Sequence, residues 1–160
     1  MKTKIITREG YLKLQQELDY LWRDERPKIT KIVTWAASLG DRSENADYTF
    51  NKRKLREIDR RVRFLRKYLF DVKVVDYNPQ QEGAAYFGAW VNLENDDGKE
   101  LDIRIVGPEE IYWHRAYISV DSPMAKACLG KRVDDEISVT TPEGNKFWII
   151  NEISYRAAAE

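Results

Sequence analysis

The stretch TWAASLGDRSENADYTF, residues 34–50, contains the only glycine between residues 11 and 71. Gly40, Asp41 and Ser43 are residue types that commonly end one helix or begin the next. Apolar residues recur at steps of three and four on both sides of them, as they do along one face of a helix. The sequence therefore predicts two helices joined by a turn at residues 40–43.

The apolar stripes of the two helices mirror each other about this turn. Antiparallel helices that pack side by side pair residues whose numbers have a constant sum. The pairs that satisfy this rule are Leu14 and Leu69, Leu18 and Leu65, Leu21 and Val62, and Trp35 and Tyr48. Because the stripe keeps its phase past Pro27, we expect a kink there and not a break. The prediction is an antiparallel coiled-coil hairpin with arms of about 45 Å, from about 30 residues at roughly 1.5 Å each.

The predicted tip, residues 40–48, carries the carboxylates of Asp41, Glu44 and Asp47. One interpretation is structural: Asp41 caps the second helix, and Glu44 completes a capping-box-like pair three residues later. The other is that Asp41 and Glu44 are oxygen ligands for Mg²⁺, which proteins hold with one or two carboxylates plus phosphate oxygens and waters. Two carboxylates alone would bind the ion weakly. A second macromolecule would have to supply the remaining ligands.

The second helix carries a strong excess of positive charge. Residues 51–70 contain nine basic and two acidic side chains. Five of the basic side chains recur at steps of three and four, opposite the apolar stripe: Arg53, Arg56, Arg60, Arg63 and Lys67. They are flanked by Lys52, Lys54, Arg61 and Arg66. An ordinary solvated face is the alternative, but such a face usually mixes both signs. The excess favours binding of a polyanion.

The hydrophobic period changes after Leu69. β-Branched and aromatic runs separated by turn residues predict strands at residues 72–77, 86–93, 101–106, 117–120, 136–140 and 146–155. A short helix is predicted over residues 123–129, with Ser122 as its N-cap and Gly130 after its end. The expected fold class is α+β. We expect an antiparallel coiled-coil hairpin at residues 1–75 and a small antiparallel sheet domain with one helix at residues 76–160, with residues 79–83 as a loose connection.

Composition excludes several classes of protein. No run of about 18 apolar residues exists that could span a membrane, and the N-terminus has no signal-peptide pattern. A single cysteine, Cys128, and a single histidine, His114, exclude a disulfide framework, a thiolate zinc site and His-rich metal catalysis. Phosphate-binding and dinucleotide-binding glycine patterns are missing. We therefore expect a soluble cytoplasmic protein in which Cys128 and His114 have packing roles.

Residues 35–48, WAASLGDRSENADY, closely resemble the tip of the Gre family of bacterial transcript cleavage factors. The similarity continues in TREGY at residues 7–11, LREIDRR at 55–61 and ISVDSPMA at 118–125, so it covers essentially the whole chain. The tip and the basic second helix point to the GreB branch. The resemblance implies that the hairpin enters the secondary channel of RNA polymerase. It also implies an FKBP-like globular domain that docks on the channel rim through Asp121, Ser122 and Pro123.

The resemblance also implies roles for residues of the hairpin. Asp41 and Glu44 would help hold the second catalytic Mg²⁺ of the polymerase and position the attacking water, supported by Ser43 and Asn45. The basic patch of Lys52, Arg53, Arg56, Arg60 and Arg61 would hold the extruded 3′ part of the nascent RNA. The polymerase would then hydrolyse its own backtracked RNA. By this reading the chain is no enzyme, is a monomer, and binds no cofactor when free, because it shares Mg²⁺ only in the complex.

Three other functions remain open. A regulator of the same fold could block the channel without stimulating cleavage, although intact Asp41 and Glu44 argue against this. A free-standing enzyme such as a peptidyl-prolyl isomerase is supported by fold analogy alone. A plain coiled-coil nucleic-acid binder would bind RNA unaided and with a steep dependence on salt.

Overall fold

The computed structural model describes residues 2–41 and 44–155. The chain separates into two compact units, residues 9–72 and residues 1–8 together with 73–160. We call the first the hairpin and the second the sheet unit. The expected boundary at residue 75 differs from this division, because the first eight residues and residues 73–75 belong to the sheet unit. The physical reason is the parallel pairing of strands β1, Ile5–Thr7, and β2, Lys73–Val75.

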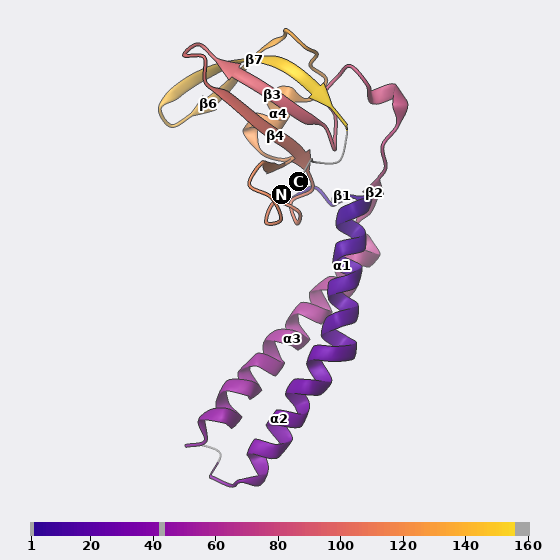
Figure 1. Cartoon of the computed structure of the whole chain (residues 1–160), viewed down its shortest axis with the longest axis vertical. Coiled ribbons are helices and arrows are strands. Elements are labelled where there is room, and N and C mark those ends of the chain that lie inside the picture. Colours follow the sequence, from indigo (N-terminus) through magenta and orange to yellow (C-terminus); the bar gives the residue numbers. More distant parts are fainter. Residues whose placement is uncertain (1, 42–43, 156–160) are drawn as a thin grey trace. The chain divides into compact units, whose positions relative to one another are not determined.

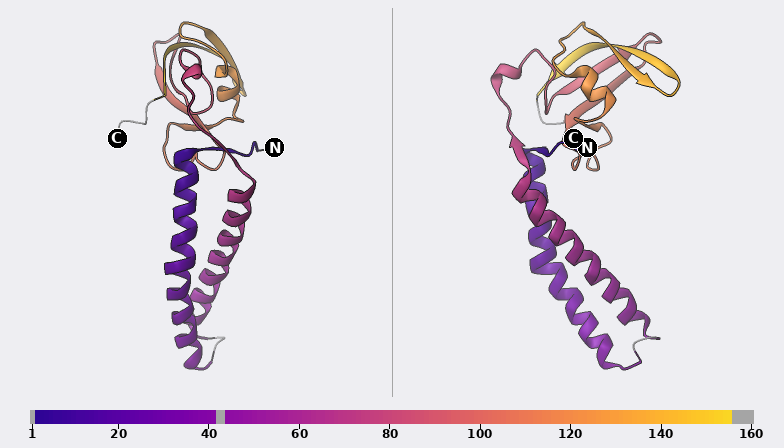
Figure 2. Two further views of the ribbon diagram at one scale, coloured as in Figure 1. Left: turned by 90° about the vertical axis from the view of Figure 1, so that its right-hand side faces the viewer. Right: turned by 180° about the vertical axis from the view of Figure 1, so that it is seen from behind.

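The hairpin consists of two antiparallel arms, which Figures 1 and 2 show side by side. The first arm contains helix α1, Arg8–Tyr20, the π-helical turn η1, Leu21–Glu25, and helix α2, Arg26–Ser38. The second arm is the single helix α3, Ala46–Asp71. The predicted helical hairpin is confirmed. Within the described part of the chain, no helix combines the length and apolar character needed to cross a membrane.

The apolar stripe of α3 packs against the first arm as predicted. Ile58, Val62 and Leu65 on this stripe are buried. Ile58 and Val62 form a cluster with Ile29 of α2, and partly buried residues pack around it: Leu18, Leu21, Ile32, Val33 and Leu55. Burial of a branched aliphatic side chain contributes about 1.5–3 kcal/mol. The seam between the arms is therefore the main source of stability in the hairpin.

The π-helical turn changes the phase of the first arm. The Arg26 N–H donates to the carbonyl of Leu21, five residues earlier, so this turn contains one residue more than an α-helical turn. Consequently Ile29 and Ala36 face the second arm, with exposed fractions of 2% and 0%. Trp35 is 55% exposed, so the predicted pairing of Trp35 with Tyr48 in the seam is wrong.

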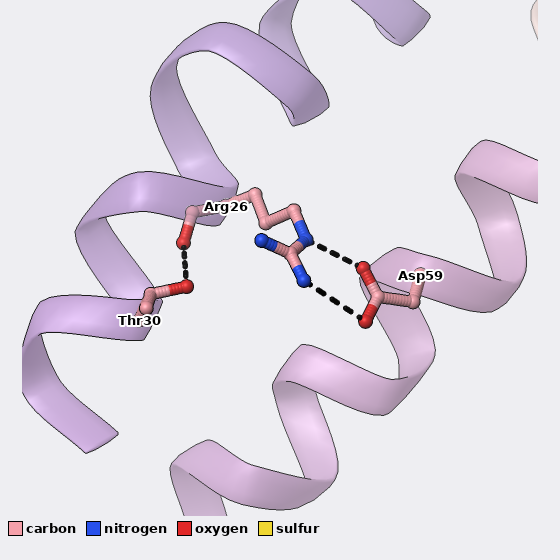
Figure 3. A network of polar contacts seen from close by, with 3 residues as sticks. All are labelled: Arg26, Thr30 and Asp59. Carbon is pink, nitrogen blue, oxygen red and sulfur yellow. Dashed lines mark hydrogen bonds and ion pairs between the residues drawn. The ribbon is translucent and has the colours of Figure 1, made fainter. Parts of the chain in front are cut away.

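Among the described residues, three ion pairs join the two arms. Arg26 and Asp59 form two hydrogen bonds, of 2.7 and 3.4 Å, which Figure 3 shows. Arg61 binds Glu17 in the same two-pronged way at 2.7 and 2.9 Å, and Lys54 lies 3.3 Å from Glu25. These side chains are partly exposed, and each such pair contributes at most about 1 kcal/mol. Their main effect is to fix the register of the arms.

The sheet unit contains a five-stranded sheet with the order β5-β4-β3-β7-β6. The strands are β3 Trp90–Asn95, β4 Glu100–Val106, β5 Tyr117–Ser119, β6 Glu136–Thr141 and β7 Gly144–Ser154. Three of the four pairings are antiparallel, as predicted, whereas β4 and β5 run parallel. The predicted α+β fold class, a helical hairpin followed by a sheet with one short helix, is confirmed.

The core of the sheet unit lies between the sheet and helix α4, Pro123–Cys128. As predicted, the Ser122 hydroxyl accepts a hydrogen bond from the Ala125 N–H, and Gly130 has a φ of +80° after the helix end. Cys128 is fully buried, and burial raises the pKa of its thiol to about 11. The thiol is therefore protonated at neutral pH and has the packing role expected for it.

A buried carboxylate holds strand β1 in the sheet unit. Glu110 is 1% exposed and accepts hydrogen bonds from the backbone N–H groups of Thr7 at 3.0 Å and Gly107 at 2.8 Å, and from the Thr7 hydroxyl. A Cβ atom at Gly107 would lie 2.2 Å from the carbonyl oxygen of Ile5, so only glycine fits there. The sequence alone gave no indication of this contact, because its partners are about a hundred residues apart.

The connection after β2 is more regular than predicted. Residues expected to be loose form the short 3₁₀ helix η2, Pro79–Gln81. The Asn78 side chain accepts from the Gln80 N–H, and the Gln81 side chain accepts from the Asn78 N–H. This reciprocal cap satisfies backbone donors that a loose chain would leave to water.

Candidate functional site

The tip of the hairpin is a tight turn that changes the chain direction within a few residues. Gly40 and Asp41 both adopt positive φ angles, +79° and +44°. Glycine adopts this conformation freely, and aspartate is one of the few other residues that tolerate it. The Glu44 N–H then donates to the Asp41 carbonyl at 3.1 Å, which closes the turn. Ser43, a predicted supporting residue, lies outside the described residues.

Asn45 ties the two arms together at the tip. Its side-chain oxygen accepts from the Tyr48 N–H at 3.1 Å, which makes Asn45 the N-cap of α3. Its side-chain amide donates to the carbonyl of Ala36, at the end of α2, at 2.8 Å. The interpretation of Asp41 as the cap of the second helix is therefore wrong, because Asn45 occupies that position.

The acidic residues of the tip are exposed. Asp41 and Glu44 in the turn and Asp47 in the first turn of α3 all lie at the surface of the hairpin. Large apolar side chains nearby are also exposed, namely Leu39 at 59% and Phe50 at 60%. Within residues 2–41 and 44–155, no group of three or more His, Cys, Asp or Glu side chains could hold a metal ion. The tip thus offers two carboxylates in the turn, beside apolar surface.

The predicted basic patch divides into two groups. Lys52, Arg53, Arg56 and Arg60 are exposed on α3, as expected, and so are Arg63 and Lys67 farther along the same row. Arg61 differs, because its guanidinium is engaged by Glu17 of the first arm. Most of the exposed positive charge of α3 therefore lies on the outward row, whereas Arg61 contributes to pairing of the arms.

A cluster around Trp22 was missed by sequence reasoning. Trp22 is 46% exposed, and the guanidinium carbons of Arg66 and Arg26 lie 4.5 and 5.3 Å from its ring centroid. Arg26 also binds Asp59. The four-residue spacing of Trp22 and Arg26 is a local signal for this contact. Arg66 could not be found in this way, because it comes from the other arm.

The predicted docking residues lie at the start of α4. The Asp121 carboxylate accepts hydrogen bonds from the hydroxyl of Thr3 at 2.5 Å and from its N–H at 2.7 Å, and these bonds lower the pKa of Asp121. Ser122 caps the helix. Pro123 is exposed. Two of the three residues therefore shape this loop, and Pro123 presents its ring to solvent.

His114 has the packing role that the sequence suggested. Its ring lies 5.2 Å from that of Tyr117 and 5.5 Å from that of Trp90, and its Nδ1 accepts from the Ala116 N–H at 3.0 Å. These contacts fix the loop before β5.

Comparison with protein families identifies both parts of the chain. The profile of the N-terminal part of the transcription elongation factors GreA and GreB matches residues 4–74. The profile of the GreA/GreB C-terminal part matches residues 80–155. The two matches together cover almost the whole chain.

Individual relatives agree with these profiles. Transcription elongation factor GreB of Vibrio parahaemolyticus is 70% identical over 156 residues, which cover 97% of this chain and 96% of that protein. GreB of Pseudomonas syringae is 61% identical over 155 residues, 97% of this chain and 99% of that protein. The predicted resemblance to the GreB branch is confirmed.

Solved structures also match along the length of the chain. The Gfh1 protein of Thermus thermophilus is 27% identical and covers 96% of this chain and 99% of its own, with a TM-score of 0.41. A GreA/GreB factor from Nitrosomonas europaea is 19% identical over 96% of this chain and 100% of its own, with a TM-score of 0.43. The assignment rests on the sequence matches: the chain belongs to the GreA/GreB family of transcription elongation factors.

Proposed function

We propose that this chain is a monomeric cytoplasmic transcript cleavage factor for RNA polymerase. In this proposal the hairpin enters the secondary channel of the polymerase and brings its tip to the active site. The polymerase then cleaves its own backtracked nascent RNA, and a new 3′ end becomes available for extension. The chain supplies side chains to a site that belongs to the polymerase and has no turnover of its own.

The observation that carries this proposal is that Asn45 caps α3 at the tip, while Asp41 and Glu44 are exposed in the turn. Asn45 caps α3 and links it to Ala36, so the fold of the tip does not require Asp41 or Glu44 as a cap. Both are nevertheless acidic, exposed, and placed in the turn that ends the hairpin. Exposed carboxylates at such a position are suited to an interaction with a partner.

The chemistry of these side chains fits Mg²⁺. Carboxylate oxygens are the ligands that this ion prefers, and Asp41 and Glu44 supply two carboxylates. Mg²⁺ usually keeps further oxygen ligands from phosphates and waters, which the polymerase, the RNA and solvent would provide. In two-metal hydrolysis, a second bound Mg²⁺ activates the attacking water and stabilises the charge on the reacting phosphate. Asp41 and Glu44 would hold the ion and orient that water.

The exposed basic residues of α3 support the RNA part of the proposal. Lys52, Arg53, Arg56 and Arg60 begin about two turns after the tip and continue along the helix. Phosphate groups of single-stranded RNA bind such a row by neutralisation of charge. RNA held along the row is directed toward Asp41 and Glu44. Arg61 has a smaller part in this proposal, because its guanidinium already binds Glu17.

We further propose that the loop at Asp121, Ser122 and Pro123 docks on the polymerase. Asp121 and Ser122 are engaged in internal hydrogen bonds that fix the loop. Pro123, exposed at the first position of α4, is the group with free surface for the contact. A loop that is already ordered loses little conformational entropy on binding.

The direct test is addition of the purified chain to a backtracked elongation complex with Mg²⁺. The expected result is shortening of the transcript from its 3′ end, followed by renewed extension when nucleotides are added. A transcript of unchanged length, in a complex that demonstrably binds the chain, would instead support the second candidate function, a channel-binding regulator without cleavage. The exposure of both tip carboxylates favours the first function over the second.

A further inference from the structure

The surface around Trp22 combines an exposed indole with several guanidinium groups. Trp22 lies in η1, the π-helical turn of the first arm, and is 46% exposed. The Arg66 guanidinium carbon, from α3, lies 4.5 Å from the ring centroid, and that of Arg26 lies 5.3 Å away. These distances are typical of cation–π contacts. Two guanidinium groups therefore lie near the indole, which keeps an exposed surface on the hairpin.

The position of this cluster is fixed by the fold. Arg26 is held by Asp59 of α3, with its guanidinium in the two-pronged geometry visible in Figure 3. The Thr30 hydroxyl donates to the carbonyl of Arg26 at 2.8 Å, one turn along α2. Because the π-helical turn contains an extra residue, it sets the direction of Trp22 relative to the seam. The exposed ring has little conformational freedom to lose on binding a ligand.

The neighbouring charges on α3 are positive. Residues three, four and seven positions apart share one side of a helix, so Arg56, Arg63 and Arg66 lie on the same side as Asp59. Arg56, Arg63 and Arg66 are exposed. The single acid on this side, Asp59, is paired with Arg26. On the α3 side, a ligand at Trp22 therefore meets an aromatic surface bordered by cations.

We infer that the Trp22 surface is a stacking site for an unpaired base of single-stranded RNA. Aromatic rings and guanidinium planes both stack on nucleobases, and proteins that bind single strands combine such platforms with basic grooves. The adjoining arginines hold the flanking phosphates. This inference rests on the proposed function, in which the extruded nascent RNA runs along the hairpin. The basic row of α3 contacts the phosphates of the RNA. Trp22 of the first arm would contact a base.

The competing explanation is that the cluster only stabilises the pairing of the arms. That explanation predicts that loss of the indole lowers the thermal stability of the hairpin and leaves RNA affinity unchanged. Base stacking predicts a loss of affinity that depends on the bases of the ligand and not on its phosphates. The two explanations can therefore be separated with the free chain.

The test measures binding of two labelled 12-nucleotide probes to the full chain by fluorescence anisotropy at low salt. One probe is oligoadenylate, and the other is a strand of the same length and charge built from abasic ribose units. Trp22→Leu should weaken oligoadenylate binding about tenfold and leave abasic binding unchanged. Trp22→Phe, which keeps an aromatic face, should recover most of the loss. The dependence of affinity on salt should keep its slope, because no phosphate contact is removed.

The matched control is Trp35→Leu, which removes an exposed indole from α2 at a different place on the same arm. It should bind both probes like the unchanged chain. Equal affinities of Trp22→Leu and the unchanged chain for oligoadenylate would overturn the inference, as would an equal loss for both probes or no binding of oligoadenylate by the unchanged chain. Transcript shortening in a backtracked complex tests the proposed function separately. A base-dependent loss at Trp22 without transcript shortening would refute the proposed function alone.

Discussion

The side-chain amide of Asn45 donates a 2.8 Å hydrogen bond to the carbonyl of Ala36, across the turn between the two arms of the hairpin. The same side chain caps α3 through the Tyr48 N–H. One residue therefore closes the end of one helix and the beginning of the next. The turn between them, which carries Asp41 and Glu44, is held at both of its ends.

This relationship predicts the effect of changes at Asn45. Asn45→Ala removes the cap and the bond to Ala36, and it should lower the stability of the hairpin by about 1–2 kcal/mol. Asn45→Asp keeps an oxygen that can cap α3 but has no amide hydrogen for Ala36, so its loss should be smaller. Chemical unfolding followed by the helical circular dichroism signal measures both. If the Asn45→Ala variant were as stable as the unchanged chain, the two hydrogen bonds of Asn45 would not stabilise the hairpin.

The π-helical turn predicts which residues of α2 support the seam. Ile29 is 2% exposed and packs with Ile58 and Val62, so Ile29→Ala should cost about 2–5 kcal/mol. Trp35 is 55% exposed, and Trp35→Ala should change stability by only about 0.5 kcal/mol. Chemical unfolding of the two variants tests which face of α2 packs against α3. A larger loss of stability for Trp35→Ala than for Ile29→Ala would mean that Trp35, and not Ile29, lies in the seam.

That stripe shows how far sequence reasoning reached and where it failed. Steps of three and four in α3 depend on one regular helix, and they correctly predicted the buried residues there. The first arm has the same spacing of apolar residues. Its π-helical turn contains one extra residue, which rotates α2 relative to α1, and the spacing does not reveal this turn. Trp35 was consequently placed in the seam. The hydrogen bond from the Arg26 N–H to the Leu21 carbonyl, five residues earlier, leaves no periodic signal in the sequence.

The tip illustrates a second limit of the sequence. Asp41, Glu44 and Asn45 are all residue types found at helix starts, and their spacing favoured Asp41 as the cap. The structure gives this position to Asn45, because its amide can also reach Ala36 of the other arm. The strands of the five-stranded sheet and α4 were predicted well, since alternation and capping residues are local, whereas β1 was not predicted. Tertiary contacts such as that of Glu110 with Thr7 were not accessible.

Asp121 predicts a pH dependence of stability in the sheet unit. The hydrogen bonds from the Thr3 hydroxyl and N–H lower the pKa of Asp121 below its usual 3.8. A carboxyl group with a lowered pKa in the folded state stabilises the fold above its unfolded-state pKa, and this contribution is lost as pH falls through the folded-state value. Asp121→Asn should thus lower the melting temperature at pH 7, with a difference from the unchanged chain that shrinks as the pH falls through the lowered pKa of Asp121. A difference in melting temperature that does not change with pH would show that the ionised Asp121 carboxylate is not its cause.

The exposed row on α3 predicts an effect that depends on RNA length. Reversal of charge at Arg53, Arg56 and Arg60 to glutamate should reduce cleavage of long extruded RNA by about tenfold or more, because several phosphate contacts become repulsive. Release of dinucleotides, which requires little RNA outside the active site, should change much less. Gel analysis of complexes backtracked by different distances measures both.

The matched control for this prediction reverses three exposed cations of the first arm, Arg23, Lys28 and Lys31. This change alters the net charge of the chain equally and leaves the row on α3 intact. It should affect long and short products much less than the α3 variant does. Equal losses for long and short products in the α3 variant would argue against an RNA track along this helix.

The proposed function assigns the Asp41 carboxylate a direct part in cleavage. Asp41 adopts a positive φ that asparagine also tolerates, so Asp41→Asn should fold normally. In a backtracked elongation complex with Mg²⁺, this variant should still bind the polymerase and should cleave the transcript about a hundredfold more slowly. Asp47→Asn, which neutralises an exposed carboxylate in the first turn of α3, should cleave at nearly the original rate. Cleavage by Asp41→Asn at the rate of the unchanged chain would contradict the account.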